Sequence, residues 1–512
     1  MEPWDGPAAV CATDGRFVIA GLDRNGLRPL RYSITRHNML VVGSETGMVK
    51  FDEEDIVEKG AVGPGQTIAV DLQETKFYHD GELKDMLAAR QDFAAWTKRI
   101  TVIDHIVKTD APEPVRLDAE GLRRRQLAVG FSLEDMELIL HPMVETAQEA
   151  IGSMGDDAPI AVLSDKYRGM HHFFRQSFSQ VTNPAIDSLR ETRVMSLKTR
   201  LGNLGNVLDE NEEQCDLLQL ESPVLSSAEF EAMRRTMGDS ACVVDATFKI
   251  ANGEGGLRRA LERIRREAEE GVRAGCTHVI LTDEAMSPER APIPMILATG
   301  AVHTHLVRQS LRTFTSLNVR SSECLDVHYF AVLVGVGATT VNAYLAQECI
   351  ADRHARGLFG TLSLKECVAR YKKAVDKGLL KVMSKMGISV ISSYRGGYNF
   401  EAIGLSRALV GEFFPGMPSR ISGIGLPGIA HKVLELHEKA WSGNVVTLDV
   451  GGQYRLRRSG EAHAFDNNAI HLLQTAVGTG SYRMFKKYSE MVRKQKPVAL
   501  RDLLDFLSLI HI

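Results

Sequence analysis

The sequence predicts a multidomain α/β protein in which a β-rich N-terminal piece precedes a larger α/β piece with a mainly parallel sheet. Its 512 residues are enough for about three domains of roughly 150 residues each. Short apolar runs broken by turn residues continue to about Leu72, a pattern typical of antiparallel strands. Further on, strand-like and helix-like segments alternate, and this order predicts parallel strands covered by helices.

The N-terminal runs are FVIAGL, LRPLRYSI, MLVVGSE and QTIAVDL. Between the first two lies GLDRNGLRPLRY (21–32), where Asn25-Gly26 favours a tight turn that pairs the flanking runs as a hairpin. The same stretch could instead be an anion-binding loop, because it is rich in arginine. We interpret its arginines as ties within this domain or to its neighbour: Arg24, Arg28 and Arg31.

A linker is expected at KTDAPEP (108–114), where prolines and charges cluster. Beyond it, SLEDMELIL and SSAEFEAMRR each open with a capping-box pattern, at Ser132 and Ser226. A long amphipathic helix is predicted to end at Gly275 and to lead into the strand HVILTD; its apolar positions are Leu257, Ala260, Leu261, Ile264, Ala268 and Val272. Two further buried strands are predicted, at 329–338 and at 388–394.

Composition excludes several classes of protein. Lys and Arg total 61 against 65 Asp and Glu, and the net charge of −4 gives no basic excess for nucleic acid. Seven cysteines without Cys-x-x-Cys spacing indicate a reducing compartment and mostly buried thiols. The acidic N-terminus does not resemble a signal peptide, and no run reaches the ~18 apolar residues of a membrane span. We therefore expect a cytoplasmic protein that binds neither nucleic acid nor membrane.

Three local patterns are candidate sites, and each has a simpler structural explanation. Gly335-Val-Gly337-Ala-Thr-Thr340 could hold a phosphate between a strand and a helix, although tight packing of the strand against the helix explains it better. His303 and His305 would share one face if their segment were a strand, as two metal ligands must. Cys11 could be a nucleophile, but ten residues precede it. The residues alone yield no complete catalytic constellation.

Long blocks of the chain resemble the large subunit of glutamate synthase, up to about Phe506. They include MEPWDGPAA, GLDRNGLRPLRY, GSETGMVK, DMELILHPMVE, HHFFRQSFSQVTNPAIDSLRE, GVGATTVNAYLA and MSKMGISVISSYRGGYNFEAIGLSRALV. The resemblance implies an enzyme that hydrolyses glutamine, passes the ammonia through a tunnel and condenses it with 2-oxoglutarate, reducing the product to glutamate with reduced FMN. It also implies a [3Fe-4S] cluster, which receives electrons from ferredoxin or from a small subunit that binds NADPH and FAD.

The resemblance implies that the chain is an internal fragment of such a large subunit. Residues 1–90 are expected to be the C-terminal part of an N-terminal-nucleophile (αββα) amidotransferase domain, 91–450 the central domain, 451–506 a linker and the start of the FMN-binding domain, and 507–512 a non-native tail. The nucleophilic cysteine, the FMN-binding barrel and the cluster cysteines would then lie outside the chain. The fragment alone is expected to be inactive, with no catalytic, cofactor or metal residues of its own.

Its expected role is to hold two active sites in register and to help enclose the ammonia tunnel. Small neutral polar residues suit such a wall, and the candidates are Ser179, Gln180, Thr182 and Asn183. Alternatively, Thr182 and Asn183 cap a helix that starts near Ala185. A second interpretation of the whole chain is a catalytically silent scaffold or regulatory protein derived from the same domains. Either form could be an oligomer.

Overall fold

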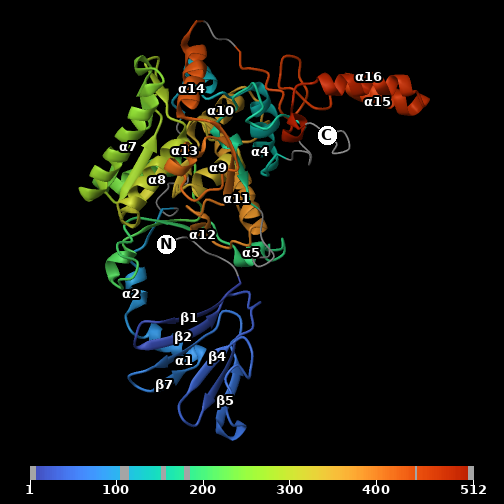
Figure 1. Ribbon diagram of the computed structural model, residues 1–512. Coiled ribbons are helices and arrows are strands. Elements are labelled where there is room, and N and C mark those ends of the chain that lie inside the picture. Colours follow the sequence, from blue (N-terminus) through green and yellow to red (C-terminus); the bar gives the residue numbers. More distant parts are fainter. Residues whose placement is uncertain (1–6, 104–114, 151–156, 178–184, 444–446, 505–512) are drawn as a thin grey trace.

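The computed structural model describes residues 7–103, 115–150, 157–177, 185–443 and 447–504. A β-rich N-terminal domain lies at one end of the molecule and a larger α/β body lies above it (Figure 1). A pair of helices near the C-terminus projects from the body as an arm. The predicted α/β organisation is confirmed.

Two antiparallel sheets form the N-terminal domain. The first has the order β1-β2-β6-β7, with strands at Ala9–Thr13, Phe17–Leu22, Thr67–Asp71 and Lys76–Tyr78. The second has the order β4-β3-β5, with strands at Leu40–Gly43, Arg31–Thr35 and Ile56–Ala61. Helix α1 (Asp80–Ala88) covers the outer face of the first sheet, where Leu83 packs on Ala69 and Tyr78.

Side chains that alternate along the strands build this domain. Ala20, Leu22 and Ile68 face the second sheet and pack with Leu30 and Tyr32. The neighbouring residues on the same strands point the other way, toward α1. Because successive strand residues point to opposite faces, one pair of strands serves two cores.

The Asn25-Gly26 turn forms as predicted, but it does not close a hairpin. Gly26 has φ +60° and donates its N–H to the carbonyl of Asp23 at 3.2 Å. The strands on either side belong to different sheets, because β2 pairs with β1 and β6 whereas β3 pairs with β4 and β5. The hairpin prediction is therefore wrong: the turn passes the chain from one sheet to the other.

A five-stranded sheet, all parallel, forms the centre of the body. Its order is β12-β18-β17-β15-β13, with strands at Val224–Leu225, Thr340–Asn342, Ser316–Arg320, His278–Thr282 and Ala241–Asp245. From β13 onward each connection moves one strand along in the same direction, and its helices are α7 (Gly255–Arg273), α8 (Met295–Arg308) and α9 (Val327–Gly335). The mainly parallel sheet is confirmed.

Helices cover both faces of this sheet. On β15, Val279 and Leu281 join the main core with Leu257 and Leu261 of α7. Ile280 points the other way and packs with Phe230 of α6 (Ser227–Met237) in a smaller core. Such burial on both sides explains the continuous apolar run HVILT.

Local signals of helix ends are confirmed. Ser226 and Glu229 form a capping box at the start of α6. Ser132 and Asp135 also exchange hydrogen bonds, at 2.8 and 3.2 Å between backbone N–H and side-chain oxygen. All six apolar positions predicted for the long helix are buried in α7, and Gly275 follows it with φ +101°.

Two predicted strands are wrong. Residues 329–338 lie mostly in α9, so GVGATT comes after a helix and before β18, the reverse of a phosphate-binding loop. In 388–394 only Val390 makes an isolated bridge, to Ser196, and α12 (Ile391–Tyr394) is a single helical turn. Short apolar runs that are buried on every side carry no periodicity to separate helix from strand.

The remaining elements complete the body. Ahead of the central sheet lie α2 (Phe93–Thr97), β8 (Thr101–Val102), α3 (Ala119–Ala128), a π-helix (Asp135–Leu140), α4 (His141–Thr146), a 3-10 turn (Met170–Phe173), β9 (Phe174–Gln176), α5 (Glu191–Val194), β10 (Thr199–Leu201), a 3-10 turn (Glu212–Cys215) and β11 (Leu218–Leu220). Within and after it lie β14 (Thr247–Lys249), β16 (Arg290–Pro292), α10 (Tyr344–Ala355), α11 (Leu364–Lys385), β19 (Phe400–Leu405), α13 (Arg407–Phe413), β20 (Ile421–Ile424) and α14 (Leu426–Trp441). Short 3-10 turns also occur at Glu53–Asp55, Gly238–Ser240, Ile250–Asn252, Arg312–Phe314 and Leu500–Leu503.

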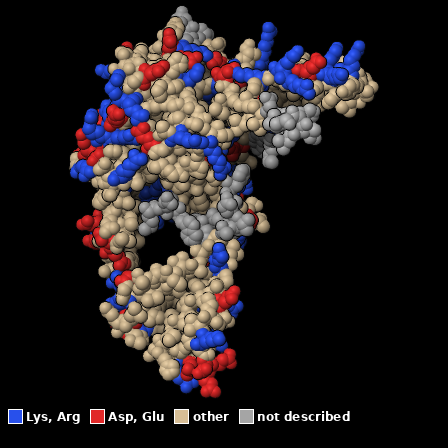
Figure 2. Space-filling model, in the orientation of Figure 1, with Lys and Arg blue, Asp and Glu red and all other residues tan. Residues whose placement is uncertain are grey.

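The arm consists of α15 (Asn467–Thr479) and α16 (Tyr482–Lys494), which pack on each other. Lysine and arginine side chains gather on it (Figure 2). On α16 the rings of Tyr482, Phe485 and Tyr488 stack in series.

Gly378 of α11 tests how tightly the main core is packed. An added Cβ would lie 2.4 Å from Cγ2 of Val327, which is buried in α9. Alanine favours a helix by ~1 kcal/mol, but overpacking costs about 1–3 kcal/mol. We expect Gly378→Ala to lower the free energy of unfolding by roughly 1–2 kcal/mol in chemical denaturation.

Gly411→Ala in α13 is the matched control, because nothing lies within 4 Å of the Cβ that it would add. The free energy of unfolding of this variant should rise by up to about 1 kcal/mol, because alanine favours a helix more than glycine does. Equal stabilisation by both substitutions would show that α9 and α11 are not in close contact.

Candidate functional site

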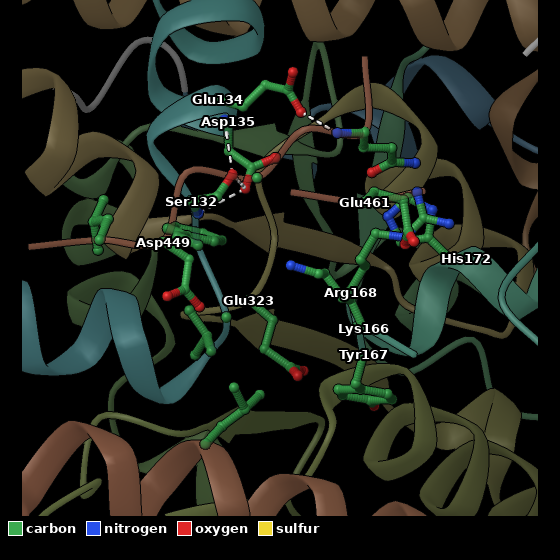
Figure 3. A pocket seen from close by; sticks show the side chains of 18 of the residues that line it. Ser132, Glu134, Asp135, Lys166, Tyr167, Arg168, His172, Glu323, Asp449 and Glu461 are labelled. Carbon is green, nitrogen blue, oxygen red and sulfur yellow. Dashed lines mark hydrogen bonds and ion pairs between the residues drawn. The ribbon is translucent and has the colours of Figure 1, made fainter. Parts of the chain in front are cut away.

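A cavity of about 810 Å³ lies beside the carboxyl edge of the parallel sheet (Figure 3). Its walls come from the end of α3, the π-helix, residues 165–172, the segment after β17, α14 and residues 448–461. Ligands of open α/β sheets commonly bind beyond the carboxyl ends of the strands. This cavity is therefore the candidate functional site.

Asp135 brings one carboxylate into the cavity from the start of the π-helix. Its Oδ2 accepts hydrogen bonds from the N–H and the hydroxyl of Ser132, at 2.8 and 2.6 Å. Burial raises the pKa of Asp135 to about 6 despite these bonds. π-helical turns are frequent at functional sites because they shift side chains out of regular register.

Glu323 brings a second carboxylate from the segment that follows β17. Its Oε2 accepts hydrogen bonds from the N–H of Met295 and the hydroxyl of Tyr329, both at 2.7 Å. Burial, together with the negative charge of Asp283, raises the pKa of Glu323 to about 7. Glu323 therefore changes its protonation state near neutral pH.

Asp283, at the end of β15, fixes the segment that carries Glu323. Its carboxylate accepts the backbone N–H of Ser322 at 2.9 Å and the Ser322 hydroxyl at 2.7 Å. Burial raises the pKa of Asp283 to about 6. This clamp joins the carboxyl ends of β15 and β17, so the sheet itself positions Glu323.

The opposite wall carries Tyr167, Arg168, His171 and His172 (Figure 3). Burial lowers the pKa of His171 to about 4 and that of His172 well below its usual value, so both rings are neutral at pH 7. The Tyr167 hydroxyl is buried and accepts or donates no hydrogen bond among the described residues. Arg168 donates to the carbonyl of Pro159 at 2.9 Å.

Residues 448–461 close the cavity because Glu134 holds their backbone. The buried carboxylate of Glu134 accepts the N–H groups of Gln453, Tyr454 and Arg455, at 2.5, 3.1 and 2.9 Å. Glu461 accepts a 2.5 Å hydrogen bond from the Ser164 hydroxyl. A loop tied at both ends forms a fixed wall.

The cavity can bind a ligand and hold or release protons. The carboxyl groups of Asp135 and Glu323 have raised pKa values, and His171 and His172 are neutral at pH 7. Among the described residues, no group of three or more His, Cys, Asp or Glu is spaced to hold a metal ion.

The four tunnel candidates, Ser179, Gln180, Thr182 and Asn183, lie outside the described residues. The segments on either side are anchored: Ser177 donates its N–H to the carbonyl of Asn399 at 3.0 Å, and Ile186 to Ser384 at 2.8 Å. The helix predicted near Ala185 is wrong, because residues 185–187 are not helical and α5 begins at Glu191. The capping alternative therefore has no helix to cap.

Arg24 crosses from the N-terminal domain to the body. Its Nη2 donates to the carbonyl of Gly387 at 3.2 Å, just beyond α11. Arg90 adds a second tie, because its Nη2 lies 3.2 Å from Oε2 of Glu210. The interpretation of Arg24 as a tie to the neighbouring domain is confirmed.

The other candidates do not form sites. His303 and His305 lie on helix α8 and diverge: Nδ1 of His303 accepts from Arg312 at 3.1 Å, whereas His305 pairs with Glu269 at 2.5 Å. Cys11 lies exposed on β1, opposite Ala20. Of the seven cysteines only Cys324, Cys349 and Cys367 are buried, so the expectation of mostly buried thiols is wrong.

Sequence reasoning missed the cavity itself. Asp135 was identifiable only as a helix cap, and Glu323 follows a strand, SLNVR, that the apolar pattern did not single out. The available signal was the run of polar residues SSECLD directly after that strand, at the edge where sites are expected.

Residues 124–406 match the family model of the glutamate synthase central domain, and residues 1–96 match that of class-II glutamine amidotransferases. The chain belongs to the glutamate synthase family. The central-domain match contains the parallel sheet and the buried carboxylates Asp135 and Glu323.

Relatives of this glutamate synthase chain match it almost end to end. The chain is 67% identical to the glutamate synthase [NADPH] large chain of Azospirillum brasilense, over 99% of this chain and 34% of the relative. It is 37% identical to the Bacillus subtilis glutamate synthase [NADPH] large chain and 38% identical to ferredoxin-dependent glutamate synthase 2 of Synechocystis, each over 99% of this chain. It spans about a third of the length of these curated relatives.

Solved structures match only distantly. A flavocytochrome b2 mutant covers 67% of the chain with 8% identity and a TM-score of 0.27, too low a similarity to define the fold. In the described part of the chain, no helix has the length and apolar character of a membrane span.

Replacing Glu323 by glutamine should change how stability depends on pH. A raised pKa means that the folded state binds the proton more tightly than the unfolded state, so the wild type loses stability as pH rises from about 4.5 to about 7. We expect the free energy of unfolding of Glu323→Gln, measured by urea denaturation, to rise relative to that of the wild type by up to roughly 3 kcal/mol between pH 5 and pH 8.

Asp449→Asn is the control, since Asp449 lies on the exposed rim and pairs with Lys439 at 2.6 Å. Its stability relative to the wild type should change little over the same pH range. A pH-independent difference for Glu323→Gln would show that Glu323 is equally acidic in both states.

Proposed function

We propose that the chain is part of an enzyme that makes L-glutamate from L-glutamine and 2-oxoglutarate, using reducing equivalents, as a step of ammonia assimilation. Within it, this part holds the two catalytic ends in register and helps to line the route that ammonia takes between them. Membership in the glutamate synthase family and the names of the relatives support this.

The observation that carries the tunnel assignment is the anchoring of the segments around 178–184. Ser177 is fixed to Asn399, and Ile186 is fixed to Ser384 at the end of α11. Gly387, three residues beyond Ser384, accepts the hydrogen bond of Arg24 from the N-terminal domain. Ile186, on the C-terminal side of the candidates, is therefore anchored close to the contact between the two domains.

The chemistry of the candidates suits ammonia. Ammonia attacks a carbonyl carbon through its lone pair, and protonation to ammonium removes that lone pair. Hydroxyl and amide groups such as those of Ser179, Gln180, Thr182 and Asn183 can hydrogen-bond ammonia without protonating it. A carboxylic acid in the same position would protonate it.

The cofactors of the reaction are FMN and a [3Fe-4S] cluster, with FAD on the small subunit in an NADPH-dependent enzyme. Relatives are named for NADPH, NADH and ferredoxin, so the electron donor is one of these classes. Cysteines of the described residues form no group suited to a cluster. The family resemblance supports placing the residues that bind these cofactors in other parts of the enzyme.

The finer organisation is proposed on the same basis. Residues 1–90 form the end of an αββα amidotransferase domain, 91–450 the central domain, 451–506 the entry to the FMN-binding domain and 507–512 a non-native tail. The paired sheets and α1 supply three layers of such a domain. We also propose a cytoplasmic location and oligomeric assembly.

A catalytically silent scaffold or regulatory protein is the second candidate. It would keep the end of the amidotransferase domain and the central domain without either catalytic part. The purified chain should show neither glutaminase activity nor bound flavin under either proposal. Reconstitution of activity by adding the remaining domains would select the enzyme.

The tunnel assignment is tested by bulky apolar side chains at Thr182 and Asn183 in a full-length enzyme. If these residues line the route, Thr182→Leu with Asn183→Leu should block transfer, so that glutamine hydrolysis exceeds glutamate synthesis by severalfold. The measurement is the ratio of the two rates, which is one to one when ammonia is fully transferred.

Ser188→Leu is the matched control, because Ser188 is exposed in the turn that precedes α5. It should leave the ratio at one. Full coupling in the double variant would exclude Thr182 and Asn183 from the route.

A further inference from the structure

The cavity is strongly acidic for an enclosed space. Nine carboxylate side chains line it, against four lysines and arginines. Two of these cations are already paired at its rim, Lys432 with Glu435 and Lys439 with Asp449. The carboxylates that are left after these pairs include Asp135, Glu323 and Asp326, and burying such charges without a partner is costly.

Asp135 and Glu323 can each accept further hydrogen bonds. Hydrogen bonds from the described residues reach only one oxygen of each, Oδ2 of Asp135 and Oε2 of Glu323. The charge of Asp326 raises the pKa of Asp135, so these groups repel one another. A carboxylate has lone pairs for about four hydrogen bonds, and a positively charged donor would satisfy both its charge and its open oxygen.

Tyr167 supplies an independent observation. Its hydroxyl is buried without a hydrogen-bond partner among the described residues, which buried hydroxyls rarely are. The residue lines the cavity on the side facing Glu323, and the Glu323 charge raises the pKa of Tyr167 (Figure 3). The open hydroxyl and the open carboxylate oxygens thus border the same space.

We propose that this cavity binds a small organic molecule through a primary ammonium group, held by Glu323 and Tyr167, with Asp135 adding negative charge elsewhere in the same cavity. An ammonium has three N–H donors, so it can satisfy the open oxygen of Glu323 and the Tyr167 hydroxyl together. The volume of about 810 Å³ fits an organic ligand rather than a bare ion.

Other cations suit the site less well. A metal ion needs several ligands at one point, and the described residues form no such group. A quaternary ammonium has no N–H to donate and is recognised by aromatic faces instead. Arg168, next to Tyr167 on the same wall, could receive a carboxylate carried by the same ligand, as in an amino acid.

The test is calorimetric titration of the 512-residue chain with 1,4-diaminobutane and with L-ornithine, which is the same diamine with an added carboxylate. Tighter binding of ornithine identifies an amino acid as the ligand and Arg168 as its second contact. Tighter binding of the diamine identifies a polyamine. Tetramethylammonium and magnesium chloride are the negative probes.

Two variants locate the site. Glu323→Gln keeps the shape of the side chain and Tyr167→Phe removes only the unpartnered hydroxyl, so each should fold and weaken amine binding about tenfold. Asp449→Asn at the rim should change it less than twofold.

Lower pH provides a further readout. Protonation of Asp135 and Glu323 between pH 8 and pH 5.5 should weaken binding progressively. The charged and titratable groups around these two acids are Asp283, Glu134, Asp326, Tyr329, Tyr167, Arg168, His171 and Tyr454. Burial raises the pKa of Asp283 to about 6, so Asp283 is protonated over the same range and adds to the loss of negative charge. Neither histidine becomes charged in this range, because burial holds the pKa of His171 at about 4 and that of His172 well below its usual value.

The proposal is independent of the ammonia route, since the titration needs no catalysis. It is overturned if neither amine binds at millimolar concentration, if tetramethylammonium or magnesium binds equally well, or if Glu323→Gln and Tyr167→Phe bind like the wild type.

Discussion

The hydrogen bonds between Asp283 and Ser322 are the constraint on which the functional edge of the molecule depends. Asp283 ends one central strand and Ser322 follows the next, so a single buried carboxylate sets the spacing of both exits. The position of the Glu323 backbone is set by this clamp, and hydrogen bonds from Tyr329 and Met295 fix one of its carboxylate oxygens. The geometry of the cavity is thus inherited from a rigid sheet rather than from loops, which favours a fixed site.

The features that were predicted correctly from the sequence are those that depend on residues close together in the chain. The capping boxes at Ser132 and Ser226 and the buried face of α7 depend on neighbouring residues, and they formed as expected. The turn at Gly26 was also correct, yet its strands pair elsewhere, because pairing partners are chosen by contacts far along the chain. The run at 329–338 became a helix since burial on all sides leaves no polar face to reveal its period.

The residues of the candidate site also differ in how far the local sequence reveals them. Asp135 was visible as a cap, but nothing near it in sequence shows that it shares a cavity with Glu323, nearly two hundred residues away. The raised pKa of each arises from burial, which is a property of the assembled fold. The candidates at 179–183 came from composition and family resemblance, and only their flanking anchors are structural.

The N-terminal domain and the body have separate apolar interiors: among the described residues, no buried side chain belongs to both. Between them, Arg24 supplies a polar contact with a backbone carbonyl, which releases little free energy when it forms. The two parts are therefore distinct cooperative units, and the larger interior of the body does not protect the smaller one from opening. Amide protons of the N-terminal sheets should exchange with solvent at rates set by their own small core, however stable the body becomes.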